Sequence, residues 1–117
     1  MSIRKFSFND DDHFVSWADE ETAVSLGHVS QAVLDADRDV IVVIDTSSTC
    51  VLRVYGGQGF LMELEAPENS DFQYLLSDKN RGILVVCSER NSEGDILDWY
   101  FEIDLENRSL VKDGRSY

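Results

Sequence analysis

Three carboxylates and a tyrosine alternate with apolar residues near the C-terminus, in the stretch DILDWYFEIDL of residues 95–105. Alternate side chains of a strand lie on one face, so Asp98, Glu102 and Asp104 would share a face with Tyr100. Glu102 and Asp104 would then be roughly 7 Å apart, a separation that inverting glycosidases use. Those enzymes hold their two carboxyl groups on either side of a substrate cleft, which one strand of a small domain does not provide. We therefore expect no enzymatic activity, and a small carboxylate hydrolase is only our third hypothesis.

The other candidate motifs for catalysis or metal binding fail on spacing or context. The two histidines are scattered and neither cysteine belongs to a CxxC pair, which argues against a zinc site. The segment NDDDH at 9–13 could offer three aspartates to calcium, but a surface turn is much the better explanation. The segment YGGQGF at 55–60 lacks the glycine spacing of a phosphate loop. We expect no catalytic residue, no metal and no cofactor.

The charge balance restricts the possible partners. The 117 residues include 10 Lys and Arg against 23 Asp and Glu, a net charge of −13. Binding to nucleic acid or to an anionic membrane is disfavoured, because both require basic surfaces. From Phe6 to Asp37 the chain has eight carboxylates and no Lys or Arg. Such a block repels itself unless a cationic partner meets it, although acidity can also serve solubility alone.

Length and cysteine content indicate one domain, residues 1–117, in the cytoplasm. Cys50 and Cys87 lie in apolar runs, which favours a reduced, buried pair over a disulfide. The N-terminus has no apolar segment of the kind a signal peptide needs. The longest apolar run, VIVVI at 40–44, is far too short to span a bilayer.

The hydrophobic pattern predicts an α+β fold: a mostly antiparallel sheet of about five or six strands packed by one main helix. The helix is expected at 26–36, because Leu26, Val29 and Val33 fall at i, i+3 and i+7. Residues 14–26 fit two strands, or a strand followed by the start of a helix. Residues 68–76 fit a short helix or an irregular crossing. Strands are expected at 3–8, 39–45, 49–55, 60–66, 82–88, 96–105 and 109–113.

Two hairpin registers follow from matching the apolar faces. A turn around 57–59 with Tyr55 opposite Leu61 places Arg53 opposite Glu63. Pairing Arg90 with Ile96 groups the apolar residues of 83–87 with Trp99, Phe101 and Ile103, which we assign to the core. The other face of that hairpin would carry Leu84, Val86, Asp98, Tyr100, Glu102 and Asp104.

That second face has the composition of a protein-binding site. An aromatic or aliphatic anchor usually supplies most of the affinity, while surrounding charges supply steering and specificity. Tyr100 would be the anchor here, unless it only shields the sheet and its neighbouring acids are merely solvated. The alternative interface consists of two acidic segments, with Trp17 as a possible anchor: Asp10, Asp11 and Asp12, and Asp19, Glu20 and Glu21.

Residues 26–65, with an expected helix, the strand DVIVVID and the hairpin on YGGQGF, resemble one family of small acidic immunity proteins. These belong to bacterial polymorphic-toxin and contact-dependent growth-inhibition systems. The resemblance covers about a third of the chain. It implies a cytoplasmic protein without catalytic residues that binds a cognate toxin and occludes its active site. The toxin would be basic and nuclease-like, and a monomer in a 1:1 complex is favoured. A secretion chaperone that binds an exported protein is the alternative.

Overall fold

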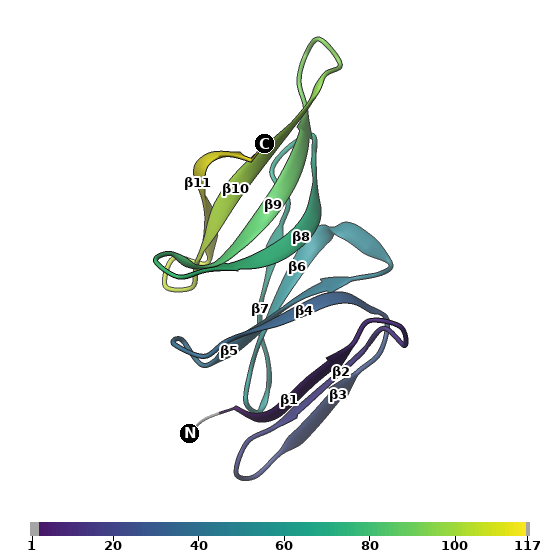
Figure 1. The fold of residues 1–117 in the computed structure, drawn as a ribbon, viewed down its shortest axis with the longest axis vertical. Helices are drawn as coiled ribbons and strands as arrows, with labels where there is room; N and C mark the ends of the chain where they lie inside the picture. Colours follow the sequence, from purple (N-terminus) through teal and green to yellow (C-terminus); the bar gives the residue numbers. More distant parts are fainter. Residues whose placement is uncertain (1–2, 117) are drawn as a thin grey trace.

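Every regular element of the protein is a β-strand in the computed structural model, which describes residues 3–116 and the side chains of residues 3–114 (Figure 1). Eleven antiparallel strands form three sheets within this range. The first sheet contains β1 (Arg4–Asn9), β2 (Phe14–Ala18) and β3 (Ala23–Leu26). The second contains β4 (Val29–Asp35), β5 (Val40–Asp45), β6 (Ser48–Gly56) and β7 (Gly59–Glu65). The third contains β8 (Ser70–Asp78), β9 (Gly82–Arg90), β10 (Ile96–Asp104) and β11 (Ser109–Ser116).

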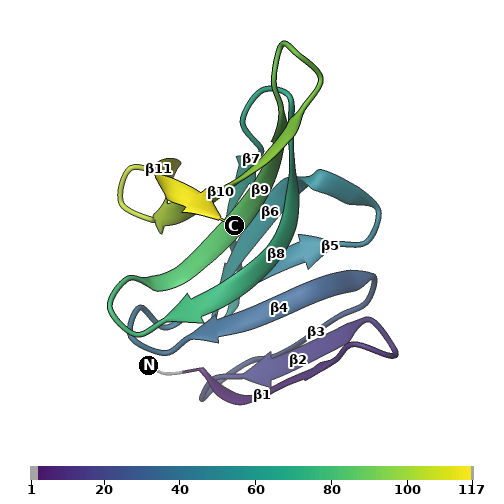
Figure 2. The same ribbon diagram turned by 45° about the horizontal axis from the view of Figure 1, so that its top comes forward.

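Each sheet is a meander in which neighbours in sequence are neighbours in space. The three meanders follow one another in chain order, with the second sheet between the other two (Figure 2). Such local connectivity needs only hairpins and short links, so no crossover is required to build the stack.

One central strand in each of the second and third sheets, β5 and β9, is buried along most of its length. In β5, Val42 and Ile44 pack against the third sheet, whereas Ile41 and Val43 pack against the first. This explains why the VIVVI run is continuous rather than alternating: both of its faces are covered. Two hydrophobic cores result, one on each side of the second sheet.

The predicted α+β fold is wrong, because the described residues contain no helix and nearly twice the expected number of strands. The predicted helix at 26–36 is mostly β4. A bulge between Val29 and Gln31 shifts the register of this strand, so Val29 and Ala32 pack into the same core although they are three residues apart. The bulge therefore imitates helical spacing. Residues 68–76 were expected to be a short helix or a crossing, but all except the first two belong to β8.

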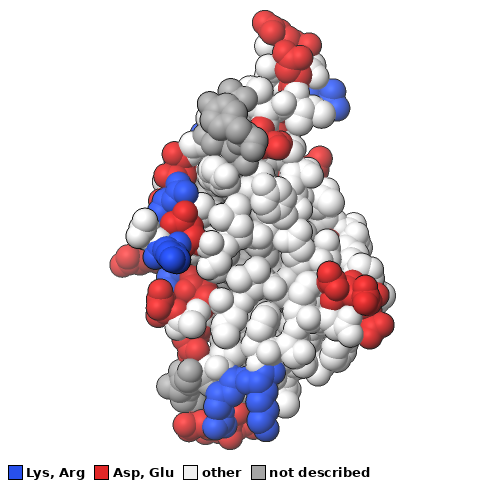
Figure 3. Space-filling view, in the orientation of Figure 1, with Lys and Arg blue, Asp and Glu red and all other residues white. Residues whose placement is uncertain are grey.

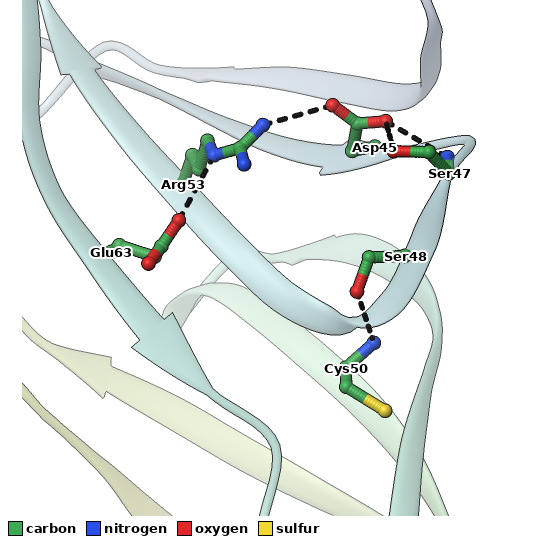
Figure 4. Close-up of polar contacts among 6 residues, drawn as sticks. All are labelled: Asp45, Ser47, Ser48, Cys50, Arg53 and Glu63. Atoms are coloured by element: carbon green, nitrogen blue, oxygen red, sulfur yellow. Dashed lines mark hydrogen bonds and ion pairs between the residues drawn. The ribbon is translucent and has the colours of Figure 1, made fainter.

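The two predicted registers agree with the structure along most of their length. Arg90 opposes Ile96, and Trp99 opposes Cys87. Arg53 opposes Glu63. The Nε of Arg53 donates to the Glu63 carboxylate at 3.1 Å, and its Nη1 donates to the Asp45 carboxylate at 2.9 Å (Figure 4). The hairpin tip differs from the prediction.

At that tip Tyr55 opposes Phe60, not Leu61. Gly56 opposes Gly59, which leaves a two-residue turn of Gly57 and Gln58, and a bulge at Leu61 restores the register. The turn is therefore one residue shorter than expected.

One amide side chain joins the second sheet to the edge of the third. Gln31 on β4 donates to the carbonyl of Gln73 at 3.4 Å and accepts from the backbone nitrogen of Leu75 at 2.7 Å. Both backbone groups belong to β8, which is the last strand on its side of the sheet. Gln31 thus satisfies part of a strand edge that would otherwise be unpaired.

The first sheet is anchored on the β6–β7 hairpin. Trp17 is 2% exposed, donates its indole N–H to the carbonyl of Gly56 at 3.2 Å, and meets the Tyr55 ring edge-on at 5.4 Å between centroids. Asp19 lies so close to Gly57 that a Cβ on this glycine would be 3.0 Å from the Cβ of Asp19. A side chain at position 57 would force Asp19 to shift by a few tenths of an ångström.

Gly57→Ala should therefore destabilise the protein by about 1–3 kcal/mol, because the added methyl group overpacks the contact with Asp19. Urea unfolding would measure the change. Gly27→Ala is the matched control, since a Cβ at Gly27 meets no atom within 4 Å. Equal stability of the two variants would contradict this account of the contact.

Candidate functional site

The predicted row on β10 lies largely on one surface, the side of the third sheet that faces away from the second. Tyr100 opposes Val86, and Glu102 opposes Leu84, so these four residues share that side with Asp98. Asp104 lies at the end of the strand and has a local role. Its carboxylate accepts from the backbone and side-chain nitrogens of Asn107 at 3.0 and 2.8 Å, which lowers its pKa.

Leu84 and Val86 are completely buried, so they support this surface without being accessible to a partner. The accessible apolar side chains are others, which the sequence analysis did not assign to this surface. Tyr74 and Leu76 on β8 align with Val86 and Leu84, and Ile96 and Val111 lie on β10 and β11. We call the set Tyr74, Leu76, Ile96, Tyr100 and Val111 the third-sheet face.

Most carboxylates around the third-sheet face already have partners within the chain. Arg81 bonds to Asp78 at 3.1 Å and also to Asp113. Its guanidinium lies 5.7 Å from the centre of the Tyr100 ring. Asp98 accepts a hydrogen bond from the hydroxyl of Ser88. This surface is therefore apolar at its centre and partly neutralised around it.

The segment from Asp10 to Asp12 forms the β1–β2 turn, and its three carboxylates are exposed. The side-chain oxygen of Asn9 accepts from the backbone nitrogens of Asp11 and Asp12 at 3.0 and 3.2 Å, an Asx-type arrangement that orders the turn. Within the described residues none of the three carboxylates forms an ion pair. In Figure 3 an acidic patch without adjacent basic residues lies at the right edge, where Figure 1 places this turn. We call Asp10, Asp11 and Asp12 the acidic turn.

The other half of the predicted alternative interface lies elsewhere. Asp19, Glu20 and Glu21 belong to the β2–β3 turn, at the opposite end of β2 from the acidic turn. Five residues of strand separate the two turns by roughly 17 Å, so they do not form one patch. Asp19 is only 5% exposed, and its Oδ1 accepts from the backbone nitrogens of Glu21 and Thr22 at 2.8 and 2.7 Å.

Trp17, the anchor suggested for that interface, belongs to the core. Phe14 is the exposed aromatic residue near the acidic turn instead, with 43% of its surface accessible. It is the first residue of β2 and opposes Asn9, which holds the turn. The acidic turn and Phe14 therefore combine adjacent carboxylates with an apolar side chain.

The two cysteines differ in environment, so the expectation of a buried pair is wrong for Cys50. Cys87 is buried and Cys50 is exposed, and both are free. Cys50 lines an open cleft with Glu65, Asp71 and Arg90. A hydrogen bond from its Sγ to Asp71 at 3.3 Å raises the pKa of the Cys50 thiol, and burial raises that of Cys87 to about 12.

Comparison with known proteins gives no further assignment: no protein-family model matches the chain, nor does any curated protein or solved structure. Among residues 3–116 no group of three or more His, Cys, Asp and Glu is placed to hold a metal. The same range contains no helix long and apolar enough to cross a membrane.

The turn hydrogen bonds of Asp19 should make stability depend on pH. The backbone N–H groups of Glu21 and Thr22 lower its pKa in the folded state below the usual 3.8. The corresponding stabilisation is complete above pH 3.8 and is lost as the pH falls through the folded-state pKa. Asp19→Asn should lower stability at pH 7 and reduce the loss between pH 5 and 2, as measured by chemical unfolding at each pH. Glu20→Gln, an equal change of charge in the same turn, is the control, and identical pH profiles for both variants would contradict the role of Asp19.

Thiol alkylation should distinguish the two cysteines. Native protein should take up one iodoacetamide adduct, at Cys50, and unfolded protein should take up two, because only the exposed thiolate reacts. Asp71→Asn should speed the native reaction, since it removes the carboxylate that raises the pKa of Cys50. Mass spectrometry over time would measure both effects. Native labelling of Cys87 at a similar rate would contradict the burial of this thiol.

Proposed function

We propose that the protein is a non-catalytic binding module that captures a basic protein through the acidic turn and Phe14. The observation that carries this proposal is the exposure of three adjacent carboxylates, none of which forms an ion pair within the described residues, beside a 43% exposed phenylalanine. A cationic partner would relieve the mutual repulsion of these carboxylates.

Charge and anchor would have different roles in such a complex. The net charge of −13 attracts a basic protein over distances set by the ionic strength, and the acidic turn orients the encounter. Phe14 would supply the apolar contact that slows dissociation, as buried aromatic residues usually do. The proposal therefore predicts that the acidic turn mainly sets the association rate and that Phe14 mainly sets the dissociation rate.

The acidic turn is a better candidate than the β10 row for electrostatic recognition. Around the third-sheet face Arg81 pairs with two carboxylates and the Ser88 hydroxyl bonds to Asp98. A partner would have to compete with these internal bonds. At the acidic turn a partner would have almost no internal bonds to replace. Within the described residues the carboxylates of Asp10 and Asp11 accept no hydrogen bond, and that of Asp12 accepts one, from the side-chain amide of Asn9.

An immunity protein is the physiological role that we propose for this module. A nuclease-like toxin must be basic to approach phosphates, and a rapid, charge-steered inhibitor suits such a target. The resemblance to immunity proteins was based on an expected helix, a strand and a hairpin within residues 26–65. The expected helix is a strand in the structure, so the resemblance now depends on β5 and the β6–β7 hairpin alone. A hydrolase gains no support, since Asp104 caps a turn.

Affinity capture from the native cell lysate, washed at low and then high salt, should retain a basic protein that salt releases. With that protein purified, replacing all three residues of the acidic turn by Asn should slow association at least about tenfold at low salt. Phe14→Ala should mainly speed dissociation. Glu20→Gln with Glu21→Gln, which removes two charges at the other end of β2, should change association much less. Retention of no basic protein, or unchanged rates in both test variants, would refute the proposal.

A further inference from the structure

The third-sheet face is an exposed apolar surface that the proposed function leaves unused. Six large apolar side chains are exposed among the described residues, and three of them lie on this face. They are Tyr74 at 41%, Ile96 at 61% and Val111 at 45%. Leu76 and Tyr100 lie between them and are half-buried. Apolar side chains gathered on one side of a sheet usually mark an interaction surface.

The strand beneath this face, β9, has apolar residues on both of its sides, as a strand buried between two other layers has. In β5 both rows of apolar residues are covered by neighbouring sheets. In β9 the row of Ile83, Val85 and Cys87 belongs to the core shared by the second and third sheets, whereas Leu84 and Val86 point to the other side of the sheet and are fully buried without belonging to that core. The third-sheet face therefore resembles the two faces of the second sheet, each of which is covered by another sheet.

We propose that the third-sheet face packs against the same face of a second copy, related to the first by a two-fold axis. Sheets already pack face to face twice within the chain, and such packing is a common way to bury apolar faces. A two-fold contact uses one self-complementary surface and closes at two copies. It leaves the acidic turn free, because that turn belongs to the first sheet at the other end of the stack (Figure 1).

The other end of the stack is a poorer match for this face. The outward side of the first sheet carries mainly small residues, with Phe14 at one end: Ser7, Ser16, Ala18, Ala23 and Ser25. These offer little apolar surface to bury, so head-to-tail stacking of copies would gain less than pairing of two third-sheet faces. Head-to-tail contacts would also continue into filaments unless they closed into a ring.

The size of the face suits a dimer of moderate affinity. Four strands of up to nine residues cover roughly 30 by 19 Å in projection. The accessible area of such a corrugated surface is larger, on the order of the 800 Å² that each partner buries in a standard interface. The apolar centre must outweigh like charges around it, because five carboxylates and two guanidinium groups lie on or beside the face: Asp71, Asp78, Asp98, Glu102, Asp113, Arg81 and Arg90.

This charge pattern gives the dimer a distinctive response to salt. Screening weakens the repulsion between two acidic rims and leaves apolar contact intact. Salt should therefore tighten the dimer, whereas it should weaken binding of a basic protein at the acidic turn. The two proposals can thus fail separately.

Sedimentation equilibrium of the full chain between 5 and about 500 µM, in low and in high NaCl, tests the dimer. We expect a monomer–dimer equilibrium that shifts at least about tenfold towards dimer in high salt. Val111→Asp should abolish the dimer, because it replaces an exposed apolar side chain of the third-sheet face by a charge. Leu61→Asp is the matched control: Leu61 is 47% exposed, close to the 45% of Val111, but lies on β7 in the second sheet.

Circular dichroism would verify that both variants remain folded. A monomer at every concentration and salt would overturn the proposal. Loss of the dimer in Leu61→Asp but not in Val111→Asp would place the contact elsewhere and overturn it too. Growth into species larger than a dimer would exclude the two-fold arrangement.

Discussion

The burial of β5 between two other sheets is the constraint on which the rest of the structure depends. Val40 to Ile44 are all buried, and each fully buried Val or Ile side chain stabilises the fold by about 1.5–3 kcal/mol. Because alternate residues of this strand face opposite ways, one short segment organises both cores. The first and third sheets make no comparable core with one another. Each depends on the second sheet, and the contacts of Trp17 and Gln31 fix how they sit on it.

A stack of this kind separates its two exposed ends. The first sheet presents the acidic turn and Phe14, and the third presents an apolar face with a partly neutralised rim. One end is suited to recognition by charge, the other to contact by apolar area. If both proposals hold, pairing through the third sheets would direct two acidic turns outward. Binding would then be bivalent, and avidity towards a clustered or dimeric partner would not require a stronger single site.

Alternation of apolar residues was sufficient to predict the hairpin registers, because a shift of one residue would turn the core face of β9 and β10 to solvent. The same rule failed where bulges interrupt it. The bulge in β4 gave helical spacing, and a second one at Gln73 concealed β8 and with it Tyr74 and Leu76. Burial was predictable for Trp99 and Phe101 only in part, since Trp99 is half-buried. Nothing in the sequence distinguished Asp19, a turn residue, from the exposed acids next to it.

The bond from Gln31 to the edge of β8 has a consequence for how the protein fails. Pairing groups on a strand edge are a template for other chains unless something occupies them. Here the occupant comes from the neighbouring sheet, so partial separation of the second and third sheets would uncover the edge and the apolar core together. A molecule with these two sheets partly separated would be prone to aggregate before the rest of the chain unfolded. Solubility in a cell would thus depend on the lifetime of this junction as well as on the large net negative charge.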